Sequence, residues 1–270
     1  MAITSATPTT DQTNTLEVPL TLYKAMLTAA EIDRLEQQYT RSGEAFFHVA
    51  GRGHAAVAAL NPHLIADDYL NCHYRSKALM LARGMTPKAM FAGFFAVDDS
   101  HSRGRQMSAH LSCPEHHITS IVGPVGNNAL QAVGIAAEIQ AQASKPISVC
   151  CLGEGTTQQG EVLEALHEAA RSQLPVLFVV EDNQWAISTP TAGRTFYTLG
   201  GSDASDYCGI PIRYVDGLDA LACYEVFGEA ADQVRHGRSP AIVIMRTRRL
   251  SDHTNADDQS VYRDQADIDA

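Results

Sequence analysis

The chain has 270 residues, enough for one large domain with a substantial core, and a second full domain is not expected. Its formal net charge of -11 argues against binding to nucleic acid or to an anionic membrane surface, because both need a basic surface. The six cysteines have no paired spacings and no apolar run reaches the length of a membrane span, so we expect a cytoplasmic protein with reduced thiols.

The beginning of the chain is polar and rich in threonine, and we expect residues 1–15 to form a disordered leader. Residues 16–270 are then expected to form a single domain. From Leu20 to Arg41, apolar residues recur at helical spacing, which predicts an amphipathic helix. The next glycine-containing stretch, Gly51-Arg-Gly-His-Ala-Ala, predicts a turn that starts another helix.

An aromatic residue and an arginine stand side by side in the segment that ends with Tyr74-Arg75-Ser76. Arg75 is a fixed positive charge that can hold a diphosphate oxygen in a fork, and Tyr74 supplies a hydroxyl. An arginine in such a place is more often a surface ion-pair former. The pattern alone leaves both interpretations open.

The stretch from Ser102 to His110 lacks periodicity and predicts a loop. Histidine and cysteine side chains in a loop can bind zinc. Here the spacing is not one of the paired forms and half of a four-ligand site is missing, so surface histidines are the favoured interpretation. The residues concerned are His110, Cys113, His116 and His117.

Two further elements precede the central motif. Ile118 to Val122 is an apolar run that predicts a strand. The turn Gly123-Pro-Val-Gly-Asn-Asn then leads into a helix over Ala129 to Ala143, whose small side chains suit close packing.

The central motif reads as a strand, a tight turn, a helix and a second strand. Ile147 to Leu152 has the length and composition of a strand buried on both faces. Helical periodicity begins at Glu161, and Val176 to Val180 forms the second strand. Such a unit is normally right-handed and parallel, so both strands end at the edge of the sheet where open α/β sheets bind ligands.

Polar side chains follow both of these strands. Glu154 lies between Gly153 and Gly155 after the first strand, and Asn183 follows the second. A carboxylate and a carboxamide oxygen suit Mg²⁺, which fills its remaining positions with phosphate oxygens and water. The glycines allow close approach of the backbone to those phosphates. The pattern predicts a site for a metal-bridged diphosphate.

The remaining elements continue the alternation of strands and helices. Ile210 to Val215 predicts a strand, Leu218 to His236 an amphipathic helix and Pro240 to Thr247 a last buried strand. A polar loop over residues 248–263 follows. The order of elements predicts an α/β fold with a mainly parallel central sheet.

The run from Gly153-Glu-Gly-Thr-Thr to Asp182-Asn-Gln-Trp-Ala-Ile-Ser resembles the thiamine diphosphate motif of the alpha subunits of the 2-oxoacid dehydrogenases, their decarboxylating component. Glu154, where most members have Asp, is typical of the branched-chain type. The resemblance extends from about Leu20 to Arg263. It implies the three-layer αβα thiamine diphosphate-binding fold.

The resemblance also implies roles for individual residues. The Mg²⁺ ligands would be Glu154, Asn183 and the backbone carbonyl of Trp185. His253 matches the histidine beside the cofactor and is the candidate catalytic proton donor, and Val125 would lie beneath the bent cofactor. The other residues expected at the cofactor are Tyr74, Arg75, Gly153, Gly155, Thr156, Ala186 and Ile187.

Three positions depart from the family pattern. Ala55 stands where an acid is expected, Glu181 where a basic residue is common and Asp182 where the first of two asparagines is usual. A carboxylate at position 181 would weaken anion binding unless it points away from the diphosphate.

As a function, the resemblance implies the alpha subunit of an α₂β₂ assembly. The assembly would decarboxylate a 2-oxoacid, with the branched-chain type the nearest, and pass the acyl group to a lipoyl acyltransferase. Thiamine diphosphate supplies the carbanion chemistry. The beta subunit would supply the activating glutamate, so we expect the chain to be inactive alone.

Two alternatives remain open from the sequence. A split thiamine-dependent carboligase, or an enzyme that loads an acyl carrier, would keep the cofactor and change the acceptor. A non-catalytic paralogue would hold a beta subunit without binding cofactor, and the three departures favour that alternative. Acylation of a lipoyl domain and calorimetry with thiamine diphosphate distinguish these alternatives.

Overall fold

The computed structural model describes residues 11–269, and most of the predicted leader lies outside this range. Helix α1 (Asp11–Arg41) begins well before Leu20, so residues 11–15 belong to this helix. The predicted helix after Gly51 is present as the 3-10 helix η1 (Ala55–His63). Among the described residues, no helix combines the length and the apolar character that crossing a membrane would require.

The centre of the molecule is a six-stranded sheet with the order β1-β2-β3-β8-β7-β6. Every neighbouring pair is parallel except β6 with β7, which confirms the predicted α/β fold with a mainly parallel sheet. The strands are β1 (Tyr69–Asn71), β2 (Ser148–Gly153), β3 (Val176–Asp182), β6 (Asp206–Tyr207), β7 (Ile210–Asp216) and β8 (Ala241–Arg246).

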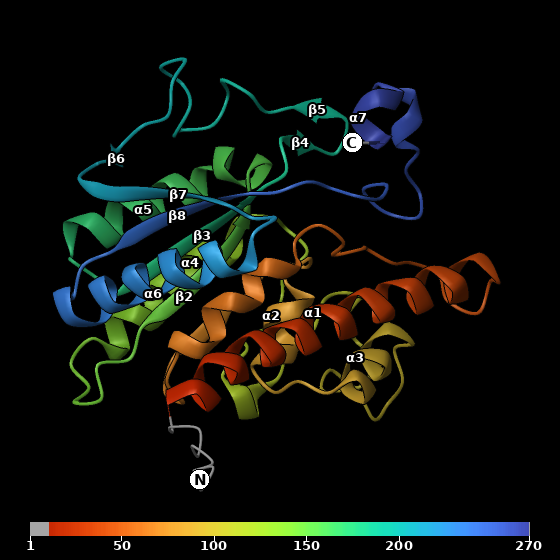
Figure 1. The fold of residues 1–270 in the computed structure, drawn as a ribbon, viewed down its shortest axis with the longest axis horizontal. Coiled ribbons are helices and arrows are strands. Elements are labelled where there is room, and N and C mark those ends of the chain that lie inside the picture. The colour runs from red at the N-terminus through yellow and green to blue at the C-terminus, as the bar shows by residue number, and fades with distance from the viewer. Residues whose placement is uncertain (1–10, 270) are drawn as a thin grey trace, which may run out of the picture.

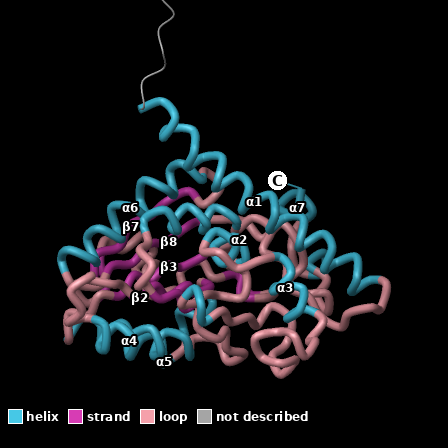
Figure 2. The backbone as a smooth tube through the Cα atoms, turned by 90° about the horizontal axis from the view of Figure 1, so that it is seen from below, coloured by secondary structure: helices cyan, strands magenta, loops and turns pink. Residues whose placement is uncertain are grey.

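Helices cover both faces of the sheet, which gives three layers (Figures 1 and 2). One face carries α1, η1, α2 (Lys77–Ala82) and α6 (Ala220–Gly237), and the other carries α4 (Asn127–Ile139) and α5 (Gly160–Arg171). The smaller elements are α3 (Pro87–Phe94), α7 (Gln265–Asp269), η2 (Pro114–His116), η3 (Gly155–Gln158), η4 (Gln259–Val261), β4 (Trp185–Ala186) and β5 (Thr189–Pro190).

Strand β3 shows how the sequence creates two cores. Val176, Phe178 and Val180 pack toward α4 and α5, whereas Leu177 and Val179 pack toward α1 and α6. Successive side chains of a strand point to opposite faces, so an uninterrupted apolar run must be covered on both sides. This burial fixes β2 and β3 at the centre and directs their ends toward one edge.

One predicted strand is wrong. Residues 118–122 form no regular strand, and Ile118 makes only isolated bridges with Leu70 and Cys113. The backbone amides of Ile118 and Ile121 donate to residues 111–113, whereas the amide of Thr119 donates to β1, so no continuous ladder forms with either segment. The sheet instead ends at the short strand β1, which the sequence analysis did not predict.

Candidate functional site

The ends of β2 and β3 open into a cavity of about 270 Å³. The segment before α2, the turn before α4 and the loop after β8 complete its wall. All the residues predicted to bind the cofactor line it: Tyr74, Arg75, Val125, Gly153, Glu154, Gly155, Thr156, Asn183, Trp185, Ala186, Ile187 and His253. The structure therefore brings together residues that are far apart in the sequence.

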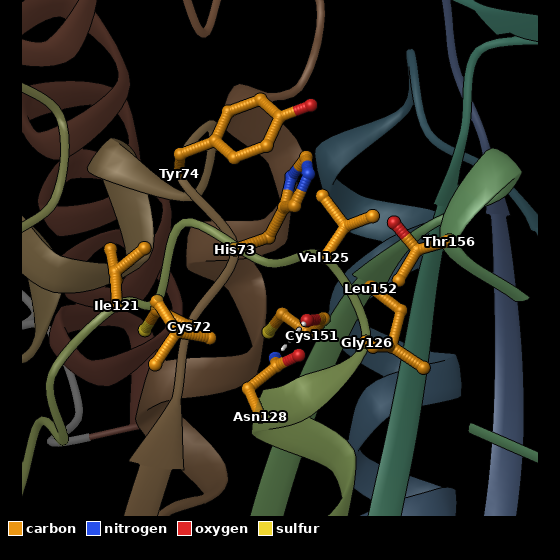
Figure 3. Close-up of a pocket in the computed structure, with 11 residues that line it drawn as sticks. Cys72, His73, Tyr74, Ile121, Val125, Gly126, Asn128, Cys151, Leu152 and Thr156 are labelled. Atoms are coloured by element: carbon orange, nitrogen blue, oxygen red, sulfur yellow. Dashed lines mark hydrogen bonds between the residues drawn. The ribbon is translucent and has the colours of Figure 1, made fainter. Parts of the chain in front are cut away.

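A smaller pocket of about 10 Å³, with room for about one water molecule, adjoins this cavity (Figure 3). The residues common to both are His73, Tyr74, Val125 and Thr156. Ile121, Leu152 and Cys72 form much of its remaining wall. The space is therefore more apolar on this side than beside Glu154.

Glu154 and Asn183 lie next to each other at the adjacent ends of β2 and β3. The backbone amide of Asn183 donates to Glu154 Oε2 at 3.3 Å, and the amide of Trp185 donates to Asn183 Oδ1 at 3.2 Å. Both side chains line the cavity and are almost fully buried. A carboxylate and a carboxamide so placed form a donor set that fits Mg²⁺.

Burial and the negative charge of Asp182 raise the pKa of Glu154 to about 8. The carboxyl group is therefore mostly protonated at neutral pH. Because a metal ligand must be deprotonated, a divalent cation has to displace this proton when it binds.

The turn that carries Glu154 requires glycine for a packing reason. A Cβ atom on Gly155 would lie 2.5 Å from the Cβ of Ala186 in β4. Thr157 Oγ1 donates to the carbonyl oxygen of Glu154 at 2.6 Å, which closes the turn. The close contact between η3 and β4 holds the Glu154 side of the cavity together.

Arg75 is a buried cation with no buried counter-ion. Its side chain is 2% exposed, and Nη1 donates to the carbonyl oxygen of Ala50 at 2.6 Å. Among the residues that the structure describes, no carboxylate lies within ion-pair distance of it. A buried charge is costly unless it is paired, so this guanidinium favours an anion in the adjacent cavity.

The same arginine holds His253. Arg75 Nη2 donates to His253 Nδ1 at 3.0 Å and to its carbonyl oxygen at 2.9 Å. Nε2 therefore carries the proton of the neutral ring. Burial, with the charges of Arg75 and Arg249, lowers the pKa of His253 to about 4, so the imidazole is neutral at physiological pH.

The two acidic residues that depart from the family pattern both point away from the cavity. Glu181 is fully buried and contacts His54 and Ser76. Asp182 accepts hydrogen bonds from the Tyr197 hydroxyl and from the backbone amide of Gln184, both at 2.9 Å. Glu181 therefore does not oppose an anion in the cavity, which removes one of the features that favoured a non-catalytic paralogue.

Sequence reasoning missed three residues at the site. His73 and Gln159 line the cavity, and both ring nitrogens of His73 are buried without a hydrogen-bond partner. Arg249 is 2% exposed and donates to the carbonyl oxygen of Ile187 at 2.9 Å. His73 directly precedes Tyr74, and that adjacency was the one available signal.

The four residues considered as a zinc alternative do not form a ligand group in the described part of the chain. The group whose ligand atoms come within 4.8 Å of one another is His101, Cys113 and Glu115, which shares only Cys113 with that alternative. His110, His116 and His117 are half-buried, and His116 is the last residue of η2.

The family match to known proteins includes all the residues that line the cavity. The family model described as dehydrogenase E1 component matches residues 23–270. The chain is 35% identical over 249 residues to the 3-methyl-2-oxobutanoate dehydrogenase subunit alpha of Mycobacterium tuberculosis (strain ATCC 25618 / H37Rv), covering 92% of this chain and 65% of the relative. It is 33% identical over 251 residues to the 2-oxoisovalerate dehydrogenase subunit alpha of Bacillus subtilis (strain 168), covering 92% and 76%. The chain is 29% identical over 251 residues to the mitochondrial 2-oxoisovalerate dehydrogenase subunit alpha of Homo sapiens. This match covers 92% of the chain and 56% of the relative.

Proposed function

Because the chain belongs to the dehydrogenase E1 component family, we propose that it acts as the alpha subunit of a thiamine diphosphate-dependent 2-oxoacid dehydrogenase of the branched-chain type. The names of the relatives support the substrate class. The chain spans 65% of the Mycobacterium tuberculosis relative, so its activity, substrate and partners are part of this proposal. The observation that carries it is the cavity that joins Glu154, Asn183 and the unpaired cation of Arg75.

The residues present fit thiamine diphosphate with Mg²⁺. Glu154, Asn183 and the carbonyl oxygen of Trp185 would hold the ion, and Arg75 would hold a diphosphate oxygen. When bound, the cofactor supplies the electron sink for decarboxylation. His253 keeps a proton on Nε2 at the wall of the same cavity, where it is the candidate donor to the reacting group.

The experiment that tests this function uses the chain together with its beta-type subunit. With thiamine diphosphate and Mg²⁺, we expect decarboxylation of 3-methyl-2-oxobutanoate and acylation of a lipoyl domain, and neither with the chain alone. Product formed only with an aldehyde or a carrier protein would favour the carboligase instead. Absence of cofactor binding to the pair would favour the non-catalytic paralogue.

The pKa of His253 gives an independent check on where the diphosphate binds. Burial and the charges of Arg75 and Arg249 hold this pKa at about 4, and a dianionic group beside Arg75 offsets the contribution of the charge. We therefore expect thiamine diphosphate and Mg²⁺ to raise the pKa of His253, measured by NMR titration of labelled histidine and assigned with His253→Gln. The signal of His63, at the end of η1, should not move. An unchanged pKa of His253 would contradict a diphosphate beside Arg75.

An exposed phenylalanine marks the surface where we expect the beta subunit to bind. The side chain of Phe46 is 94% exposed, and its carbonyl oxygen accepts a hydrogen bond from Asn255 in the loop that carries His253. Loss of a central aromatic anchor costs about 2 kcal/mol or more, so Phe46→Asp should weaken assembly roughly 30-fold in sedimentation experiments. The matched variant Leu221→Asp, at an exposed position of α6, should assemble normally. Equal assembly of the two variants would rule out this surface.

A further inference from the structure

A buried chain of hydrogen bonds lies behind the metal side of the cavity. His54 Nδ1 is 2.9 Å from Glu181 Oε2, and His54 Nε2 is 3.4 Å from Asn183 Nδ2. Glu181 Oε1 accepts a further hydrogen bond from the Ser76 hydroxyl. The side chains of His54, Glu181 and Ser76 are fully buried, so water does not compete for these bonds.

The direction of each bond follows from the chemistry of the groups. The amide nitrogen of Asn183 can only donate, so Nε2 of His54 accepts from it. The proton of the neutral ring then resides on Nδ1, which donates to the carboxylate of Glu181. The nitrogen end of the carboxamide is thereby turned toward the core, and Oδ1 is the end that is left for the cavity.

We propose that His54 is a positioning residue for Asn183, with Glu181 as its anchor. This inference rests on the proposed function, in which Asn183 Oδ1 binds Mg²⁺. Without His54, only the backbone amide of Trp185 orients the carboxamide, which can then rotate and present its nitrogen, and this nitrogen repels a cation. Partners of this kind behind a metal ligand set its orientation, and their loss lowers metal affinity about 10- to 100-fold.

The anchor also connects the two halves of the site. Ser76 directly follows Arg75 and directly precedes α2, so one carboxylate contacts both the segment of the buried cation and the histidine behind the metal ligand. Three segments that are distant in sequence meet at Glu181: the turn before η1, the start of α2 and the end of β3. This role gives the buried carboxylate of Glu181 a function, although it lies beside a site that we expect to hold an anion.

The test compares two substitutions of His54 in the chain assembled with its beta-type subunit. His54→Leu removes both hydrogen bonds, whereas His54→Gln retains one donor and one acceptor. Binding of thiamine diphosphate is followed by calorimetry over a series of Mg²⁺ concentrations. We expect His54→Leu to raise the Mg²⁺ concentration for half-maximal binding by about tenfold or more, with binding recovered at saturating Mg²⁺. His54→Gln should stay close to the wild type.

The matched control is His63→Leu, which removes another inward-facing histidine of the same region that packs on Tyr224 away from the cavity. It should not change the Mg²⁺ requirement. A wild-type Mg²⁺ requirement in His54→Leu would overturn the positioning role. The positioning role would also be overturned if His54→Leu and His54→Gln lost the same amount of thiamine diphosphate binding and saturating Mg²⁺ did not restore it. That result would indicate a residue needed only for the structure.

Failure of the variant to fold and failure of the wild type to bind the cofactor can each be distinguished from loss of the positioning role. If His54→Leu does not fold, Glu181→Gln takes its place, because it keeps the shape of the anchor and weakens its bond to His54. It should raise the Mg²⁺ requirement in the same direction, and no change would overturn the proposal. If the wild-type pair binds no thiamine diphosphate at any Mg²⁺ concentration, the proposed function itself fails, and the positioning role fails with it.

Discussion

Replacing Glu154 by Gln is expected to abolish the Mg²⁺-dependent binding of thiamine diphosphate to the assembled protein. The substitution keeps the size and the hydrogen-bonding shape of the side chain but removes the carboxylate that would bind the ion. We expect affinity to fall by about 100-fold or more, which corresponds to about 2.8 kcal/mol. Calorimetry with and without EDTA measures the effect.

The stability of this variant provides the control. The folded state keeps the proton of Glu154 up to a pKa of about 8, whereas the unfolded chain loses it near 4.5. The metal-free wild type should therefore lose stability as the pH rises from about 5 to about 8, and Glu154→Gln should remove that slope. Gln resembles the protonated acid, so without metal the two melting temperatures should agree near pH 4, and that of Glu154→Gln should be the higher one at neutral pH. Glu161→Gln, at an exposed position of α5, should bind cofactor normally. Wild-type affinity in Glu154→Gln would remove the carboxylate from the metal site.

Replacing Arg75 by Gln is expected to have an effect of similar size through a different mechanism. The guanidinium is the buried positive charge that would meet the diphosphate, and it also holds the backbone and ring of His253. Each bond to a charged group contributes about 1.5–3 kcal/mol, so loss of two or more should lower cofactor affinity by roughly 100-fold or more. Proteolysis should also cut the loop of residues 248–263 faster, because its link to Arg75 is lost.

Arg83→Gln is the matched control for this experiment. Arg83 is also partly buried near α2, but it donates to the carbonyl oxygens of Ala66, Asp68 and His116. Its loss should lower stability without changing cofactor affinity. An Arg75→Gln variant that loses only stability, as this control does, would show that Arg75 serves the fold alone. Lysine at position 75 should not restore binding fully, since it lacks the planar fork.

The central part of the site could be predicted because it depends on local patterns. Two uninterrupted apolar runs must be central parallel strands, and their ends must meet at one edge, so Glu154 and Asn183 were expected to be neighbours. The same reasoning failed for residues 118–122. Their apolar character indicates burial, but their backbone hydrogen bonds are divided between residues 111–113 and β1, which no local pattern reveals.

The contacts behind Asn183 and around Arg75 could not be predicted, because they too depend on segments that are distant in the sequence. His54 and Glu181 are 127 positions apart, and neither stands in a pattern that indicates the other. From sequence, Glu181 was a carboxylate near an expected anion site, and only its packing shows that it faces the core. Likewise, nothing in the sequence indicated that Arg75 lacks a carboxylate partner. Local periodicity places the strand ends, whereas tertiary packing decides what stands behind them.

The measurement that tests the account most directly replaces Mg²⁺ by Mn²⁺ and records ³¹P electron-nuclear double resonance of the assembled protein with thiamine diphosphate. We predict hyperfine coupling between Mn²⁺ and both phosphorus atoms in the wild type, and loss of the bound-ion signal in Glu154→Gln and in Asn183→Leu. Cofactor that binds without a coupled ion, or coupling that persists in both variants, would show that these two strand ends do not hold a metal-bridged diphosphate.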